Sequence, residues 1–446
     1  IVVEKTEMHE QVLELISTYA LIGREKHGKD VTIARSSTIS RTEPSVVAEK
    51  QPGPGALATL FFATAFIFAN MYTTQAILPV FSDDFHVSAP TAGFTVSVLV
   101  LAVAVGSLFY GPLSDRIGRK PVMVGASLLL AIPTFLCGIV PNFTVLIIFR
   151  ALQGLLVPGL TSVAIAYVHE TFAGKRQGLA MGIYVSGTVL GGLFARVGGG
   201  LLTGLYGWRP AMLAFALPTL IAALAMWQFL PQASSKKRVE VRPGMRAIAS
   251  LSVRGSFVRQ ALSDMGAHLH NRRLVGAFVI GFTLFFGFIG AFTYLPYYLT
   301  GPQFKLSNEA VSLVYVLWLT GAFSPVAGSQ ATRLGARRAI AYSMSLAAIG
   351  LLITLIPILP VVIVGLGLLT LGMFSTVPAV NLYLNEQATK AKGTAASMYL
   401  SLYYFGGSFG AVVPGLALLW IGWSGVVLLC LVMVAIALGA DAFLCR

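Results

Sequence analysis

From about residue 56 onward, the chain alternates long apolar runs with short polar segments. Each run has about 20 residues or more, the length at which an α-helix crosses ~30 Å of hydrocarbon. The pattern predicts twelve membrane-spanning helices, at residues 56–81, 91–114, 121–140, 142–168, 178–205, 208–230, 274–299, 309–331, 337–358, 360–384, 394–421 and 423–444.

The runs are apolar on every face, which favours buried or lipid-facing helices over strands of a membrane barrel. Barrel strands are shorter and alternate apolar with polar residues. Composition agrees, because 56% of residues are hydrophobic and only 11% are charged, which excludes a soluble globular protein of this length. The expected fold class is an all-α membrane protein.

A cationic segment occurs twice in the chain. GPLSDRIGRK at 111–120 returns, in altered form, as GSQATRLGARR at 328–338, which is 217 positions later. Three dipeptides and one single residue also repeat in the same order, at offsets of 215 to 217. They are Leu78-Pro79 with Leu295-Pro296, Glu170 with Glu386, Gly191-Gly192 with Gly406-Gly407, and Gly207-Trp208 with Gly422-Trp423. The sequence therefore predicts two six-helix parallel repeats with a binding site at their interface, an architecture typical of transporters.

The expected organisation has four parts. They are a polar N-terminal extension at 1–55, a first six-helix bundle at 56–230, a basic linker at 231–273 and a second six-helix bundle at 274–446. The extension lacks the compact apolar core of a secretory signal peptide. The linker is either a helix lying on an anionic membrane surface or a solvated connection.

The formal charge of +14 follows the membrane topology and does not indicate nucleic acid. Nineteen Lys and Arg residues fall in loops on one side of the predicted membrane, whereas the other side holds only Arg209 and Lys305. Positive loops resist translocation, so we expect both termini in the cytoplasm.

No catalytic or metal centre is expected. The three cysteines are scattered without the spacing of disulfides or metal sites, and His268 and His270 alone would make a weak metal site. The spans lack the clusters of His, Asp or Glu that a membrane enzyme needs. We therefore expect no cofactor and no enzymatic activity.

The segment GPLSDRIGRK resembles the signature loop between helices 2 and 3 of the major facilitator superfamily. Arg150-Ala-Leu-Gln153-Gly154 resembles that family's Arg-x-x-Gln-Gly element in helix 4. The glycine-rich fifth span is similar to bacterial inner-membrane permeases grouped with arabinose and drug effluxers. The resemblance implies the twelve-helix fold of that superfamily and transport activity.

The signature loop has a physical role that can be stated for its residues. Gly111 and Gly118 allow close packing and a tight turn, while Asp115 can stabilise the N-terminus of a neighbouring helix, where the macrodipole attracts an anion. Thr332 replaces Asp115 in the second copy. The loop therefore has one such carboxylate instead of two.

By resemblance, the neighbour of Asp115 is the helix that begins near Gly393, and this contact would latch the two bundles on the cytoplasmic side. Arg116 and Arg119 would pair with Glu170 at the end of the fourth span. The alternative is that these charges only keep the turn in the cytoplasm.

Two arginines lie within predicted spans. Arg150 and Arg196 are each ~12–14 Å from the outer membrane surface at 1.5 Å per residue, and the central parts of the spans contain no Asp or Glu. Neutral partners at the same level are Asn70, Thr74, Gln75 and Gln153. This arrangement favours an amphipathic substrate and leaves an anionic one open; the alternative is that Arg150 bonds to helix 1 and Arg196 extends toward the membrane surface.

Aromatic residues take the place of the arginines in the second bundle. They are Phe288, Phe292, Tyr294 and Tyr298 in the seventh span, and Tyr399, Tyr403 and Tyr404 in the eleventh. A cavity that is polar on one side and aromatic on the other suits drug-like solutes, although packing alone explains many single aromatics.

These observations predict a monomeric secondary active transporter of the bacterial inner membrane that moves a small amphipathic solute by alternating access. The resemblance implies proton-coupled efflux, although the first span has Asn70 and Gln75 where drug antiporters commonly carry an acidic residue. The alternatives are a solute uptake symporter of the same fold and a polytopic membrane enzyme or sensor. The expected partners are the solute, protons and lipid, with no nucleic acid.

Overall fold

The computed structural model describes residues 53–173, 175–232, 263 and 265–445. The expected extension at 1–55 and linker at 231–273 lie mostly outside the described residues. Residues 51–446 form one compact unit, and it is described alone. Its described residues contain helices, turns and connecting segments but no strand.

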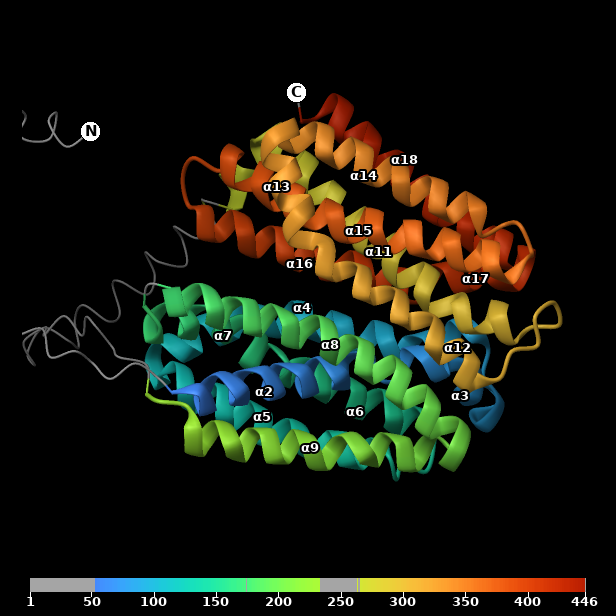
Figure 1. Ribbon diagram of the computed structural model, residues 1–446, viewed down its shortest axis with the longest axis horizontal. Helices are drawn as coiled ribbons and strands as arrows, with labels where there is room; N and C mark the ends of the chain where they lie inside the picture. The colour runs from blue at the N-terminus through green and yellow to red at the C-terminus, as the bar shows by residue number, and fades with distance from the viewer. Residues whose placement is uncertain (1–52, 174, 233–262, 264, 446) are drawn as a thin grey trace, which may run out of the picture. The chain divides into compact units, whose positions relative to one another are not determined.

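The helices fall into two consecutive sets (Figure 1). The first helix set consists of α2 (Pro54–Tyr72), η1 (Gln75–Ile77), α3 (Leu78–Phe85), α4 (Ala89–Ile117), α5 (Arg119–Cys137), α6 (Phe143–Leu156), α7 (Pro158–Thr171), α8 (Lys175–Tyr206) and α9 (Trp208–Phe229). The second helix set consists of α11 (Arg272–Thr300), α12 (Asn308–Val314), η3 (Tyr315–Phe323), α13 (Ser324–Leu334), α14 (Ala336–Ile353), α15 (Leu359–Gln387), α16 (Lys392–Gly410), α17 (Val413–Ile421) and α18 (Trp423–Phe443).

The number of membrane spans agrees with the sequence pattern. Among the described residues, eleven helices are long and apolar enough to cross a membrane, and a twelfth span is obtained when the bent pair Asn308–Phe323 and Val326–Leu334 is counted as one. The two parts of that pair meet at 47°. The prediction of an all-α membrane fold is confirmed.

Helix starts are marked by residues that satisfy the free backbone N–H groups. The Ser88 hydroxyl accepts from the N–H of Thr91 at the start of α4, and the Asn142 amide oxygen accepts from the N–H of Val145 at the start of α6. Pro90 lies two residues after Ser88, and its fixed φ suits the first turn of a helix. Local sequence therefore fixes where these spans begin.

The left-handed glycines support the internal repeat. Four described glycines have φ in this region, namely Gly118, Gly207, Gly335 and Gly422, with φ of 109°, 86°, 86° and 68°. They form two pairs, 217 and 215 positions apart, and each lies at a turn between two helices. A residue with a Cβ is strained there, so both copies of the turn use glycine.

Large apolar side chains cover the outside of the unit. Phe109, Leu205, Trp420 and Phe443 are among many that are exposed, and 87% of the Trp420 surface is accessible. Exposure of this kind is costly in water and expected in lipid. The structure thus gives the helices the lipid-facing surface that their composition predicted.

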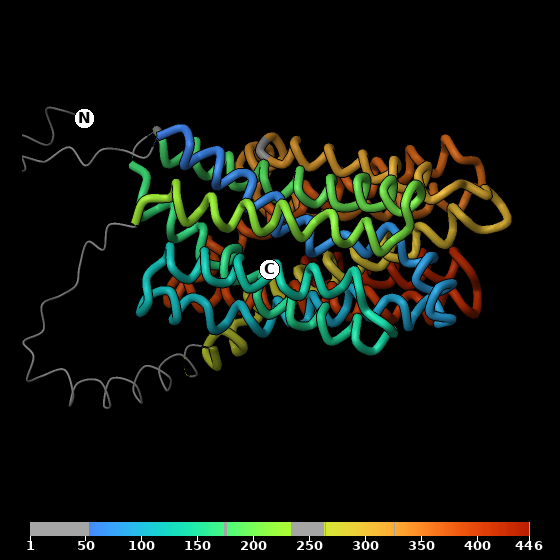
Figure 2. The backbone as a smooth tube through the Cα atoms, turned by 90° about the horizontal axis from the view of Figure 1, so that it is seen from below, coloured from blue at the N-terminus to red at the C-terminus, as the bar shows by residue number. Residues whose placement is uncertain are grey.

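The helices run side by side along the long dimension, so the bundle has two ends (Figures 1 and 2). We call the end that carries the turns after α4 and α13 the basic end, because Arg116, Arg119, Arg333 and Arg337 lie at those turns. The other end, which carries the turns after α3 and α11, is called the opposite end.

The two helix sets touch closely toward the opposite end, where α12 packs against α8 and α3 packs against α11. A Cβ on Gly93 of α4 would lie 2.1 Å from the carbonyl oxygen of Ala411, and one on Gly200 of α8 would lie 2.3 Å from the Cβ of Ser312. The Ser97 and Ser408 hydroxyls are 2.9 Å apart. Glycine and serine therefore allow the two sets to close against each other at this end.

Candidate functional site

The first span is interrupted at the depth of the predicted polar residues. Helix α2 ends at Tyr72, and a short 3-10 turn from Gln75 to Ile77 leads into α3. A helix end leaves its last carbonyl groups without backbone partners. Interrupting the helix therefore presents free carbonyl oxygens inside the bundle.

Arg150 of α6 uses these carbonyl groups. Its Nη1 donates to the Asn70 oxygen at 2.8 Å and its Nη2 donates to the Met71 oxygen at 3.0 Å. The remaining donors reach Thr95 O at 2.9 Å and Gln153 Oε1 at 2.8 Å. Arg150 is 1% exposed, and its guanidinium group lies where the negative end of the α2 dipole stabilises a cation.

Asn70 and Gln153 belong to one buried network with Arg150. The Asn70 amide donates to Thr219 Oγ1 at 2.8 Å, and its oxygen accepts from Thr134 Oγ1 at 2.7 Å. The Gln153 amide donates to the same Thr134 hydroxyl at 3.0 Å. With the bond from Arg150 to Thr95, the network joins five spans of the first helix set and holds Arg150 in a fixed position.

Arg196 of α8 has different surroundings. Its Nε and Nη2 both donate to the single oxygen Oε1 of Gln75, at 2.8 Å and 2.5 Å, and its Nη1 donates to Gly192 O at 2.7 Å. The side chain is completely buried and does not extend toward a membrane surface. Gln75 is therefore the one side chain that supplies hydrogen-bond acceptors to this cation among the described residues.

Aromatic rings surround the Arg196 guanidinium group. Its central carbon lies 3.5 Å from the centre of the Trp318 ring, 4.0 Å from that of Tyr72 and 5.6 Å from that of Tyr315. Phe292 packs on both Trp318 and Tyr315. Cation–π contacts of this kind stabilise a desolvated cation by ~2 kcal/mol or more.

Gln75 connects the two helix sets. While its oxygen accepts from Arg196 of the first set, its amide donates to Thr293 Oγ1 of the second set at 3.0 Å. The neighbouring Thr74 is fully buried, and its hydroxyl has no partner among the described residues. Arg196, Gln75 and the rings of Trp318 and Tyr315 therefore lie at the interface between the sets.

The predicted aromatics divide into two groups. Tyr403 stacks on Phe285 at 4.0 Å between ring centres, and its ring also lies beside those of Tyr399 and Tyr404. Tyr404 packs edge-on against the same Phe285 ring. Both tyrosines therefore belong to an aromatic cluster between α11 and α16.

Tyr294 and Tyr298, two of the three remaining predicted tyrosines, are held by packing within the second set. The Tyr294 hydroxyl donates to Ala411 O at 2.6 Å, and the Tyr298 ring stacks on Trp423 at 4.7 Å. The Tyr298 hydroxyl donates to Thr354 O at 3.3 Å. The structure does not bring Tyr294 or Tyr298 to Arg196.

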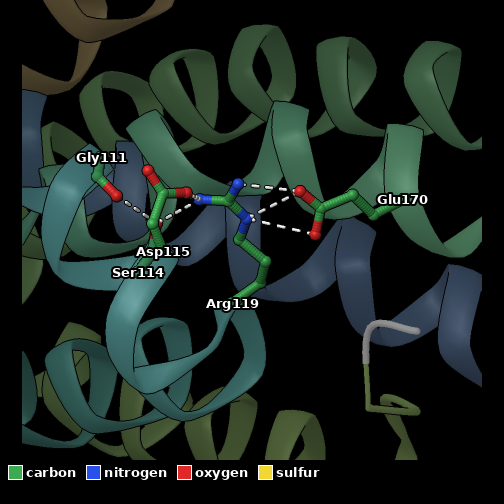
Figure 3. Close-up of polar contacts among 5 residues, drawn as sticks. All are labelled: Gly111, Ser114, Asp115, Arg119 and Glu170. Carbon is green, nitrogen blue, oxygen red and sulfur yellow. Dashed lines mark hydrogen bonds and ion pairs between the residues drawn. The ribbon is translucent and has the colours of Figure 1, made fainter. Parts of the chain in front are cut away.

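At the basic end, Arg119 joins two carboxylates (Figure 3). Its Nη1 lies 2.6 Å from Asp115 Oδ1 and its Nη2 lies 2.8 Å from Glu170 Oε1. The pairing of Arg119 with Glu170 is as expected, but among the described residues Arg116 is not paired with Glu170. Asp115 is 61% exposed at its side chain, and no side chain caps the start of α16, so the expected contact of Asp115 with that helix is not made here.

The two glycines of this loop behave differently. Gly118 has a φ of 109° and forms the turn between α4 and α5. A Cβ on Gly111 would meet no atom within 4 Å, so the close packing expected at this residue is absent from this conformation. The Gly111 carbonyl instead accepts from the Ser114 hydroxyl at 2.8 Å.

The second copy of the loop has its own ion pair. Arg337 Nε lies 3.6 Å from Asp441 Oδ1, and Arg337 Nη2 donates to the Asp441 backbone oxygen at 2.9 Å. This pair joins α14 to α18, whereas Arg119 joins α5 to α7. The two copies therefore use different charge contacts at equivalent turns.

Sequence reasoning missed the residues that enclose Arg196. Tyr315 and Trp318 are three positions apart, so they share a helix face. This spacing is visible in the sequence and could have pointed to an aromatic surface. Tyr72 and Thr293 gave no comparable signal, because a lone tyrosine or threonine in an apolar run is ordinary. The proximity of residues from separate bundles depends on how those bundles pack.

Comparisons with known proteins agree with this architecture. The sequence model of the Major Facilitator Superfamily matches residues 60–323 and 301–445. The chain is 34% identical over 380 residues to the inner membrane transport protein YnfM of Escherichia coli (strain K12), covering 85% of this chain and 88% of that protein. It is 32% identical over 393 residues to the MFS-type transporter YybF of Bacillus subtilis (strain 168), covering 86% and 92%.

Solved structures show the same fold. A bacterial homologue of the human lysosomal transporter Spinster, in an inward-facing and occupied conformation, superposes with a TM-score of 0.69 at 15% identity, covering 87% of this chain and 95% of that chain. The nucleoside transporter NupG gives a TM-score of 0.67 at 14% identity, covering 88% and 100%. The chain belongs to the major facilitator superfamily and is a secondary transporter of the membrane.

Proposed function

We propose that this transporter exports a small amphipathic solute in exchange for protons, by alternating access between its two helix sets. The observation that carries the proposal is the connection from Arg196 through Gln75 to Thr293, which joins the sets beside a ring of aromatics. A polar group at a largely aromatic interface is suited to a solute with one polar end. The same connection must break when the sets separate at the opposite end.

The basic end is proposed to face the cytoplasm of a bacterial cell, with the protein in the inner membrane. The excess of Lys and Arg at this end supports that orientation. Both termini would then be cytoplasmic. Since one chain contains both helix sets, a monomer is sufficient for transport.

The loop residues Gly111, Asp115, Arg116, Gly118, Arg119 and Glu170 are proposed to form the gate at the basic end. In this conformation Asp115 is exposed, and its ion-pair partner in the described part of the chain is Arg119 at the start of α5. Closure of the basic end would bring α16 to Asp115, whose carboxylate would then stabilise the helix start at Lys392. The structure is therefore consistent with a state whose opposite end is closed and whose basic-end latch is open.

The residues at the centre are proposed to have different roles. Arg150, Asn70 and Gln153 hold the interrupted first span in place, whereas Arg196, Gln75 and Thr74 contact the solute. On the second set, Phe292 and Tyr403 provide the aromatic surface. Tyr294 and Tyr298 would maintain the packing that supports this surface.

Proton coupling is proposed from the family resemblance. Carboxylates of the described spans lie near the membrane surfaces, among them Asp83, Asp84, Asp115, Glu170 and Asp441.

The test is a substrate screen with the purified chain in proteoliposomes under an imposed pH gradient. We expect solute movement to reverse direction when the gradient is reversed. A transported solute that shows no response to the gradient would contradict proton antiport.

Uptake by symport is the second candidate, because the same fold serves both directions. A strain in which the gene is disrupted separates the two. Export predicts greater sensitivity to toxic amphipathic compounds with unchanged growth on single carbon sources, whereas uptake predicts the reverse.

A further inference from the structure

Arg196 is a buried cation whose charge is not balanced by a carboxylate among the described residues. It is completely buried, and its acceptors are a neutral amide oxygen and a backbone oxygen. Burying a cation without a counter-charge is unfavourable unless dipoles and rings replace the lost water. The site is thus complementary to an anion that the described residues do not supply.

Burial alone does not distinguish Arg196 as an anion site, because Arg150 is buried as well. Both arginines are buried, but Arg150 donates to four separate oxygens, three of them backbone carbonyls of its own helix set. Arg196 donates to two oxygens, and two of its three bonds converge on Gln75 Oε1. Of the five N–H groups of a guanidinium, fewer are used at Arg196, and two of the three bonds depend on the Gln75 side chain.

The surroundings of Arg196 fit an aromatic acid. The rings of Tyr72 and Trp318 lie against the guanidinium group, with Phe292 behind Trp318. The Trp318 Nε1 is buried and has no acceptor among the described residues, so it is an unused donor beside the cation. A carboxylate that accepts two parallel N–H bonds is a geometric match to the group that now donates twice to Gln75.

Arg196 also depends on the second helix set for its stabilisation. Trp318 and Tyr315 belong to that set, and Thr293 of the same set holds the amide of Gln75. Separation of the sets at the opposite end would remove the two rings and the anchor of Gln75 together. The cation would then lose much of its compensation unless an anion accompanied it.

We propose that the transported solute is an organic anion with an aromatic body, and that its acid group replaces the Gln75 amide oxygen as the partner of Arg196. Binding of the anion releases Gln75 from Arg196, which weakens the link to Thr293 and permits the opposite end to open. Binding of the anion and opening of the opposite end are then coupled. This inference rests on the transport function proposed above and specifies its substrate class.

The test compares three probes of equal shape and different charge, namely 2-naphthoate, 2-naphthamide and 2-naphthylmethylamine. Their binding to the purified full chain is measured by isothermal titration calorimetry, and their transport is measured in proteoliposomes. We expect wild type to bind and move the acid in preference to the amide and the amine. Equal affinity for all three probes would overturn the proposal.

Two variants locate the anion. In Arg196→Gln we expect naphthoate affinity to fall about ten- to hundredfold, as loss of a charge-assisted hydrogen bond implies, with the weak binding of naphthamide unchanged. In Gln75→Glu, the new carboxylate would occupy Arg196 permanently, so we expect naphthoate binding to be lost while the melting temperature is maintained. Naphthoate binding at wild-type strength in either variant would overturn the assignment.

Arg209→Gln serves as the matched control, because Arg209 lies at the exposed opposite-end rim, paired with Asp84. We expect it to bind naphthoate as wild type does; an equal loss there would show a general effect of removing arginine and would overturn the site. Failure of the proton proposal is distinguishable, since naphthoate transport that depends on Arg196 but ignores a pH gradient removes antiport and leaves the anion site.

Discussion

At the residue scale, the two buried arginines illustrate how similar sequence signals lead to different environments. Arg150 is fixed by carbonyl groups at the end of α2, while Arg196 is bound to a glutamine that bridges to the other helix set. Charge and burial are the same for both side chains. The difference lies in whether their partners move during transport.

Arg150→Ala tests the scaffold role. The substitution leaves the oxygens of Thr95, Asn70 and Met71 without their donor, and each buried unsatisfied group costs ~1–3 kcal/mol. We expect the melting temperature in detergent to fall by several degrees and transport of every solute to decrease. Loss of anion transport alone, at an unchanged melting temperature, would instead assign Arg150 to substrate binding.

Asp115→Asn tests the gate at the basic end. Because the ion pair with Arg119 is largely exposed on the aspartate side, it contributes only ~0–1 kcal/mol to stability. We expect an unchanged melting temperature and a severalfold lower transport rate, since the state closed at the basic end loses its helix-capping carboxylate. Unchanged uptake or efflux in vesicles would reject the role.

The sequence predicts how deep the residues of the candidate site lie in the membrane, but it does not predict which of them form hydrogen bonds with one another. Arg150, Arg196, Asn70, Gln75 and Gln153 stand out because polar residues are rare in apolar spans. Their depth also follows from counting residues along a helix. Which of them meet depends on the interruption after Tyr72 and on the approach of the second set, and neither is encoded in local periodicity.

At the element scale, glycines determine how closely the helices of the two sets approach. Gly93 of α4 lies against the Ala411 backbone, and Gly204 of α8 lies against the Glu309 side chain. The twelve spans themselves could be predicted, because hydrophobic length fixes them. The 3-10 segment Tyr315–Phe323 could not, because nothing in an apolar run distinguishes it from a regular helix, whereas the 47° bend that follows has a sequence signal in Pro325.

Gly93→Val tests closure at the opposite end. Its Cβ would approach both Ala411 O and the Tyr294 hydroxyl closer than any tolerated contact, so α4 must separate from α16 and α17. We expect a lower transport rate and faster labelling of a cysteine introduced at Thr293 by a membrane-impermeant thiol reagent.

The control for this experiment is Gly125→Val on α5, where a Cβ would meet no atom within 4 Å. Labelling at position 293 should then match the background protein. If the Gly93 and Gly125 variants label at the same rate, closure at the opposite end does not depend on the packing of Gly93.

At the scale of the whole molecule, the two helix sets are repeats in their turns and differ in their chemistry. The left-handed glycines recur in both, yet the first set contains both buried arginines and the second contributes Trp318, Tyr315 and Phe292. The transported solute is therefore proposed to lie between a charged wall and an aromatic wall. Such asymmetry gives the interface a charged side and an aromatic side.

The most direct test of alternating access uses Ser97 and Ser408, whose hydroxyl oxygens are 2.9 Å apart across the interface. Both are replaced by cysteine in a background where the buried Cys137, Cys430 and Cys445 are alanine, because thiols so placed are within reach of a disulfide. Copper phenanthroline should cross-link the pair and abolish solute transport in proteoliposomes, and reduction should restore it. Full transport by the cross-linked protein would show that the opposite end need not open, and would contradict the account.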